Sequence, residues 1–153
     1  MKRLGRIVAG CSLAMLVAFF VAAEARAAES CHKINAMGAG QDLGGGMTQA
    51  TVVGGGLLHG TTEGHFTITG FSGTVASFAG DVEFTTNQGT LTVTVAGTLD
   101  VATGEFEAAG EVTAATGKLA GATGTLSLRG VENLSTGAFL ETITGEICVD
   151  LAP

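Results

Sequence analysis

Apolar and polar residues alternate along most of this chain. The alternation is clearest in five segments, each bounded by short turn sequences: residues 66–70, 82–86, 91–99, 105–114 and 125–129. A period of two places successive side chains on opposite faces of a β-strand, so each segment has one apolar and one polar face. No convincing helical period follows residue 27, and the one proline is the last residue. The pattern predicts an all-β domain.

Glycine- and threonine-rich sequences separate these segments. Residues 87–89, 100–104 and 117–124 have the composition of tight turns. A small-Thr-Gly-x-apolar pattern recurs three times with unequal spacing, which indicates recurring hairpins and not a solenoid. We count about eight strands, which suits a single antiparallel up-and-down β-barrel. An outer-membrane barrel is not expected, because the outward residues are Thr, Glu and Asp and there are no Trp or Tyr girdles.

The first 27 residues have the organisation of an export signal. Lys2, Arg3 and Arg6 precede an apolar run over 7–23, and small-residue cleavage sites follow, with the cut placed near residue 27. The run is shorter than the ~20 residues of a membrane span, so we expect no span once the signal is removed. Cys11 lies in a sequence similar to a lipoprotein cleavage box, but almost no apolar core precedes it.

These features predict the organisation of the chain. Residues 1–27 are predicted as a signal peptide and residues 28–46 as a strand around 32–36 followed by a glycine-rich loop. Residues 47–153 are predicted as the barrel, so that 28–153 form one domain. A bacterial-type signal predicts a secreted or periplasmic protein.

The net charge of the predicted mature chain argues against nucleic acids as partners. Beyond residue 27 the chain has three basic and 13 acidic residues, a net charge of about −10, and it contains no Trp or Tyr. So acidic a surface repels phosphate backbones, and the usual aromatic platforms for stacking bases are absent. Nucleic-acid binding is not expected.

Two cysteines lie almost at the two ends of the mature chain. Closing a barrel brings the first strand against the last. The alternation of side chains along these two strands places Cys31 and Cys148 on their outer face. In an exported protein an even pair is typical of a disulfide. We predict a Cys31–Cys148 disulfide across the seam; two free thiols are the alternative.

The stretch from Phe106 to Arg129 is similar to a known family. A strand, then Thr-Gly-Lys-Leu-Ala-Gly-Ala-Thr-Gly, then Thr-Leu-Ser-Leu-Arg-Gly, resembles the core hairpin of the allene oxide cyclase barrel family, to which dirigent proteins are related. The resemblance implies an eight-stranded antiparallel barrel with a central apolar cavity. It carries over no active site, because no residue here matches the polar and aromatic cavity positions with which plant cyclases bind a fatty-acid epoxide.

One acidic residue is predicted to lie on the same face of its strand as apolar residues. Glu141 alternates with Phe139 and Ile143, so a regular strand points its carboxyl group into the barrel. A buried carboxyl group has a raised pKa and can act as a general acid or orient a ligand. Glu141 is therefore the candidate catalytic residue; a position at a wet rim or beside a bulge is the alternative.

Inward positions with small residues, including Gly70, Gly97, Ala108, Gly110 and Ala114, predict unfilled volume. An eight-stranded barrel holds either side chains or one small ligand. The residues expected to line the cavity and contact a ligand are Phe84, Val93, Phe106, Leu126 and Ile143.

His59, Glu63 and His65 are the one compact cluster of metal-ligand types. Two imidazoles and a carboxylate suffice for zinc with a water, but no third histidine or known spacing is present. We expect a solvated loop there, and assign neither metal nor cofactor.

The function predicted from the sequence is that of an exported barrel that binds a small hydrophobic ligand in its central cavity. Two alternatives stay open: an isomerase or cyclase acting on a lipid-like substrate, and a structural protein with a surface partner. Neither the ligand nor the oligomeric state follows from the sequence.

Overall fold

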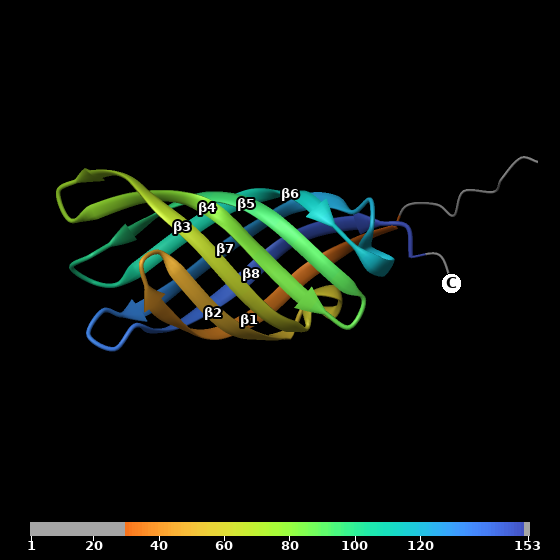
Figure 1. The fold of residues 1–153 in the computed structure, drawn as a ribbon, viewed down its shortest axis with the longest axis horizontal. Coiled ribbons are helices and arrows are strands. Elements are labelled where there is room, and N and C mark those ends of the chain that lie inside the picture. The colour runs from red at the N-terminus through yellow and green to blue at the C-terminus, as the bar shows by residue number, and fades with distance from the viewer. Residues whose placement is uncertain (1–29, 152–153) are drawn as a thin grey trace, which may run out of the picture.

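Eight antiparallel strands close into a barrel in the computed structural model, which describes residues 30–151 (Figure 1). Each strand pairs with its neighbours in the sequence, and the last pairs with the first, so the predicted all-β up-and-down barrel is confirmed. Two three-residue 3-10 turns, η1 and η2, interrupt the order of strands. The elements are β1 (Ser30–Gly44), β2 (Met47–Gly54), η1 (Gly56–Leu58), β3 (Gly60–Ser72), β4 (Val75–Thr86), β5 (Gly89–Asp100), β6 (Glu105–Ala115), η2 (Gly117–Leu119), β7 (Thr123–Asn133) and β8 (Ala138–Val149).

The predicted signal peptide, its cleavage site and Cys11 lie outside the described residues. Residues 30–151 form one barrel, and no second domain occurs among them. No helix within this range is long and apolar enough to cross a membrane.

The seam between β1 and β8 closes the barrel. Their register runs from Ser30 opposite Val149 to Gln41 opposite Ala138. A closed sheet leaves no unpaired strand edge, which removes the usual site of edge-to-edge association. Cys31 stands opposite Cys148 in this register, and a disulfide joins them, as predicted.

β1 is longer than the sequence indicated. A glycine-rich loop was predicted over residues 38–46, but β1 continues to Gly44, and the turn to β2 is confined to Gly45 and Gly46. Side chains of β8 occupy the space beside the glycines within β1. A Cβ at Gly38 would lie 2.6 Å from Oε1 of Glu141, and one at Gly40 would overlap the ring of Phe139. The side chains of β8 therefore fill the space that glycine leaves in β1.

Apolar residues from the two 3-10 turns plug one end of the barrel. Leu57 and Leu58 of η1 and Leu119 of η2 are buried, and Figure 1 shows both turns at the end where β1 begins and β8 ends. The 117–124 turn thus also supplies a core residue. Beneath the plug lies a packed core, which includes Ile34, Val52, Phe84, Leu91, Val93, Leu126, Ile143, Ile147 and Val149.

Two register shifts change which residues face inward. Beyond the shift between β5 and β6, Ala114 is exposed and Ala115 packs against the core. Beyond the shift between β3 and β4, Gly70 stands opposite Ser77, on the outer side of the sheet. The expectation that Gly70 and Ala114 face inward was therefore wrong. A bulge adds one residue to a strand and reverses the alternation beyond it.

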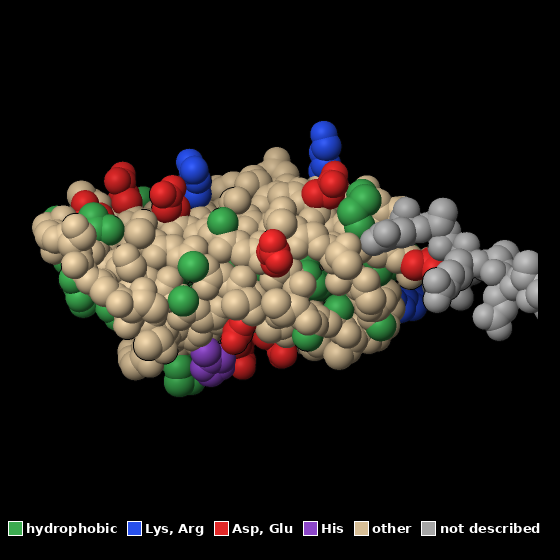
Figure 2. Space-filling view, turned by 90° about the horizontal axis from the view of Figure 1, so that it is seen from above, with side chains coloured by type: hydrophobic (Ala, Val, Ile, Leu, Met, Phe, Trp, Pro, Cys, Tyr) green, Lys and Arg blue, Asp and Glu red, His purple; other side chains and the backbone are tan. Residues whose placement is uncertain are grey.

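The outer surface is mostly polar. On the face shown in Figure 2, hydrophobic side chains are scattered among polar ones, and acidic groups outnumber basic ones. Arg129 on β7 pairs with Glu107 on β6 at 3.4 Å, and both side chains are exposed. An exposed pair of this kind contributes little to stability.

Candidate functional site

A cavity of about 160 Å³ lies inside the barrel, at the end away from the leucine plug. It opens to solvent at the rim, where Ile68 is 49% exposed. Its lining is mainly apolar, with four phenyl rings and three acidic side chains. The lining residues are Asp42, Gly46, Thr48, Thr62, Phe66, Ile68, Phe78, Val82, Leu99, Phe106, Leu128, Glu132, Phe139 and Glu141.

The four phenyl rings form two edge-to-face pairs. The ring centroids of Phe66 and Phe78 are 5.3 Å apart, and those of Phe106 and Phe139 are 6.0 Å apart. These separations and interplanar angles of 66° and 87° are typical of favourable aromatic contacts. The pairs come from β3 with β4 and from β6 with β8, so they hold the wall of the cavity from different parts of the barrel.

Each of these rings stands opposite a glycine on a neighbouring strand. The register pairs Phe66 with Gly80, Phe78 with Gly97, Phe106 with Gly130 and Phe139 with Gly40. A Cβ added at Gly40 or Gly130 would overlap the ring of Phe139 or Phe106, so these two rings lie over backbone that no side chain covers. The ring of Phe66 lies instead beside Gly64 of its own strand.

Glu141 lies in the wall of the cavity and not at a wet rim. Its residue is 8% exposed, and β8 has no bulge beside it. Glycine flanks it on both sides in the register, Gly38 on β1 and Gly130 on β7. No hydrogen bond or ion pair joins its carboxyl group to any other residue of the described range 30–151. Two glycines therefore make room for a largely buried side chain whose carboxyl oxygens remain accessible from the cavity and have no partner among the described residues.

Burial raises the pKa of Glu141 to about 7. The cause is desolvation, because a charged carboxylate loses its water in the apolar wall and no cation replaces it. Near neutral pH the side chain therefore exists in comparable amounts as the acid and as the carboxylate. In the first form it donates a hydrogen bond, and in the second it accepts hydrogen bonds and attracts a cation.

Two more acids lie around the mouth. The pKa of Glu132 on β7 is raised by partial burial and, to a lesser extent, by the negative charge of Asp42 on β1. Asp42 accepts a hydrogen bond from the backbone N–H of Gly44 at 2.7 Å. No Lys, Arg or His is among the residues that line this cavity. The lining of the cavity is thus mainly apolar, and the ionisable groups in it are all acidic.

The structure brings together some of the predicted site residues. Phe106 and Glu141 both line the cavity, whereas Phe84, Val93, Leu126 and Ile143 lie deeper, in the packed core, and do not line it. The small inward residues add less space than expected. A Cβ at Gly97 or Gly110 would lie 2.2 or 2.0 Å from a backbone oxygen of the next strand, so the sheet itself occupies those positions.

Sequence reasoning did not place Phe66, Phe78 and Phe139 at the site. Their parity is inward, but parity alone does not separate the level of the cavity from the level of the core. Each of these rings stands opposite a glycine, but so do the core residues Val52 and Leu126, so an opposing glycine alone does not mark the cavity. The level of each residue along the barrel follows only from the register between strands.

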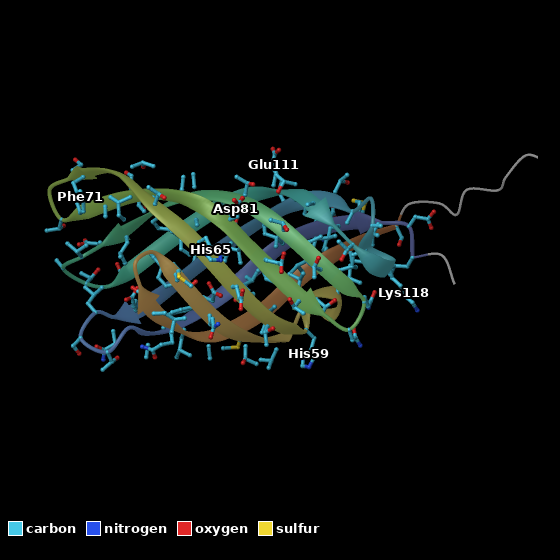
Figure 3. The ribbon with its side chains drawn as sticks, viewed as in Figure 1. His59, His65, Phe71, Asp81, Glu111 and Lys118 are labelled. Carbon is cyan, nitrogen blue, oxygen red and sulfur yellow. A yellow bond between two sulfur atoms is a disulfide. The ribbon has the colours of Figure 1, made fainter. Side chains whose placement is uncertain are left out.

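The predicted loop around His59, Glu63 and His65 is a strand. His59 directly precedes β3, and Glu63 and His65 lie on its exposed outer face. Figure 3 shows His59 and His65 well separated along the barrel. The one group of metal-ligand types found close together within residues 30–151 is Cys31, Glu146 and Cys148, where the disulfide occupies both sulfurs.

A broader depression of about 1170 Å³ lies along parts of β1–β3, β7 and β8. Its lining includes the exposed side chains of Gln41, Gln49 and Glu63. It has neither the phenyl pairs nor an unpartnered buried group. The smaller internal cavity is therefore the candidate site.

Comparison of the chain with protein families, curated proteins and solved structures finds no match. The resemblance to the allene oxide cyclase barrel family stays a prediction, and the function is argued from the geometry of the cavity.

Proposed function

We propose that this protein is an exported β-barrel that binds a small hydrophobic molecule in the cavity between its two phenyl pairs. The observation that carries this proposal is the cavity itself. Four aromatic rings surround a space of about 160 Å³ that no side chain of the described residues fills. Apolar groups lose stabilising contacts where they line an empty space, and a ligand restores those contacts.

The size of the cavity limits the ligand. An apolar cavity of about 150 Å³ in another protein stays dry and binds benzene. This cavity is of similar volume, so its enclosed part accepts one substituted benzene or an aliphatic group of that size. The opening beside Ile68 allows a longer molecule to extend into solvent.

Export is supported by two features. The disulfide between Cys31 and Cys148 is of the kind that persists in oxidising compartments. The N-terminal sequence has the basic start, apolar run and small-residue cleavage sites of a signal peptide.

Titration with toluene followed by NMR tests the binding proposal. We expect shift changes at Ile68, Leu99 and Leu128 around the cavity, and none at Leu119 in the plug. Leu99→Trp fills the cavity and is expected to weaken toluene binding by at least about tenfold; Leu140→Trp on the exposed outer face is the matched control. An unshifted spectrum at saturating toluene, or shifts confined to the outer face, would overturn the proposal.

The buried carboxyl group favours a second candidate, an isomerase or cyclase. A carboxylic acid with a pKa near 7 in an apolar cavity is suited to protonate a reacting oxygen. Isomerisation of styrene oxide to phenylacetaldehyde is the matching step: Glu141 protonates the epoxide oxygen as the benzylic C–O bond breaks, a hydride shifts between the two carbons, and the carboxylate takes the proton back. This reaction would proceed faster with the protein than in buffer, and slower with Glu141→Gln. Equal rates in buffer and with the protein would remove this candidate without affecting the binding proposal.

A further inference from the structure

We infer that the ligand of this cavity carries an ammonium group on its apolar body, and that Glu141 is the counter-ion. This inference rests on the proposed binding function and specifies the chemical class of its ligand. Three independent features of the cavity support it.

The first feature is the missing partner of Glu141. Burying a carboxylate is costly unless a cation or hydrogen-bond donors compensate it. Glu141 is 8% exposed, and no described residue hydrogen-bonds to its carboxyl group. No fully buried side-chain oxygen of the described residues lacks a partner, so the carboxyl oxygens stay accessible from the cavity that Glu141 lines. A bound ammonium group supplies both a positive charge and three N–H donors.

The second feature is the position of the rings relative to the carboxyl group. The register forms one row from Phe106 through Gly130 to Glu141. A Cβ at Gly130 would lie 2.5 Å from Cζ of Phe106, so this ring leans across the glycine toward Glu141. In the next row Phe139 stands opposite Glu132. A cation beside these acids is therefore also close to the rings of Phe106 and Phe139, and a ring that turns its face to the cation attracts it.

The third feature is the negative sign of the electrostatic field in the cavity. The charged groups of the lining are Asp42, Glu132 and Glu141, and no base is among them. The described basic residues Lys33, Lys118 and Arg129 are exposed. Such a cavity attracts cations and repels carboxylates. A free fatty acid is thus a poor fit, although the apolar walls alone would accept one.

The experiment compares four probes of similar size: toluene, benzylamine, acetophenone and benzoate. Calorimetric titration at pH 7 is expected to show benzylamine at least about tenfold tighter than toluene, the ratio that one charge-assisted hydrogen bond provides. Benzoate should be the weakest. In Glu141→Gln the ratio of benzylamine to toluene affinity should fall to about one, whatever change the two probes share. Glu63→Gln, on the exposed outer face of β3, is the matched control.

Proton exchange separates the ammonium ligand from a neutral hydrogen-bond acceptor. Because Glu141 is partly protonated at pH 7, an ammonium ligand displaces its proton, whereas a ketone retains the protonated acid. Titrations in two buffers of different ionisation enthalpy should show proton release with benzylamine. The other acids facing the cavity are Asp42 on β1 and Glu132 on β7, so the measurement is repeated with Asp42→Asn and with Glu132→Gln.

The outcomes are distinct. If toluene binds and benzylamine binds no tighter, the ammonium inference is overturned while the binding function stands. Tighter acetophenone with proton uptake would overturn it in favour of a neutral acceptor. If none of the probes binds, the proposed function falls as well. Unfolding curves of each variant by far-ultraviolet circular dichroism establish that a lost interaction is not a lost fold.

Discussion

Gly38 and Glu141 stand opposite each other across the β1–β8 seam, and the carboxyl group of Glu141 occupies the space that a side chain at Gly38 would need. A Cβ at Gly38 would lie 2.6 Å from Oε1 and 2.7 Å from Cγ of Glu141. The two residues are 103 positions apart in the chain, yet the site depends on their pairing. Glycine in β1 is thus the complement of the buried acid in β8.

Gly38→Ala is therefore expected to destabilise the protein by about 1–3 kcal/mol, because the new methyl group displaces the carboxyl group. In a Glu141→Ala background the same substitution should cost less than about 0.5 kcal/mol, since the clash is removed. Urea unfolding of the four proteins measures this coupling. Gly70→Ala, where no atom lies within 4 Å of the added Cβ, is the control. Additive effects of the two substitutions would show that the residues do not compete for space.

The raised pKa of Glu141 predicts a pH-dependent stability. The folded protein binds this proton more tightly than the unfolded chain, so stability falls as pH rises from about 4.5 to about 7 and then levels off. A difference of this size corresponds to about 3 kcal/mol. Glu132 contributes in the same direction, so the measured quantity is the difference between the wild-type protein and Glu141→Gln.

Urea unfolding between pH 4.5 and pH 8 gives this difference. The wild-type protein should lose more stability over the interval than Glu141→Gln does, and Glu63→Gln should follow the wild type. Parallel curves for the wild type and Glu141→Gln would mean that the carboxyl group is solvated in the folded state.

The disulfide is expected to be a major source of stability. Cys31 and Cys148 are 117 residues apart, and closing a loop of that length restricts the unfolded chain by about 5 kcal/mol in the chain-entropy model. Reduction should therefore lower the urea midpoint of the wild-type protein. The double variant Cys31→Ser/Cys148→Ser should unfold at the lower midpoint with or without reductant. A wild-type midpoint that reductant leaves unchanged would argue against the bond.

Leu119 is expected to be the most sensitive residue of the 117–124 turn. It is 1% exposed and closes the end of the barrel, so Leu119→Ala should cost about 2–5 kcal/mol. Leu140→Ala, at a residue 64% exposed on the outer face, should cost less than about 0.5 kcal/mol. Thermal unfolding of both variants compares the two sites. Equal losses would contradict the role of Leu119 as a plug.

Part of the site could be predicted from the alternation of apolar and polar residues. Glu141 shares parity with Phe139 and Ile143, and because β8 is regular this parity holds and the carboxyl group faces inward. The pairing of the cysteines followed in the same way, since closure of a barrel joins its first and last strands. The prediction failed at Gly70 and Ala114, where bulges reverse the alternation.

The alternation of residues by itself predicted an all-β barrel with a disulfide at its seam and with Glu141 facing inward. Only the tertiary structure decided at which level each inward residue lies. Phe84 and Phe106 both occupy inward positions of their strands, yet Phe84 belongs to the packed core and Phe106 lines the cavity. The physical reason is that a period of two selects the face of a strand, whereas position along the barrel depends on the register between strands. That register places glycine opposite each ring and on both sides of Glu141, through pairings between residues far apart in the chain.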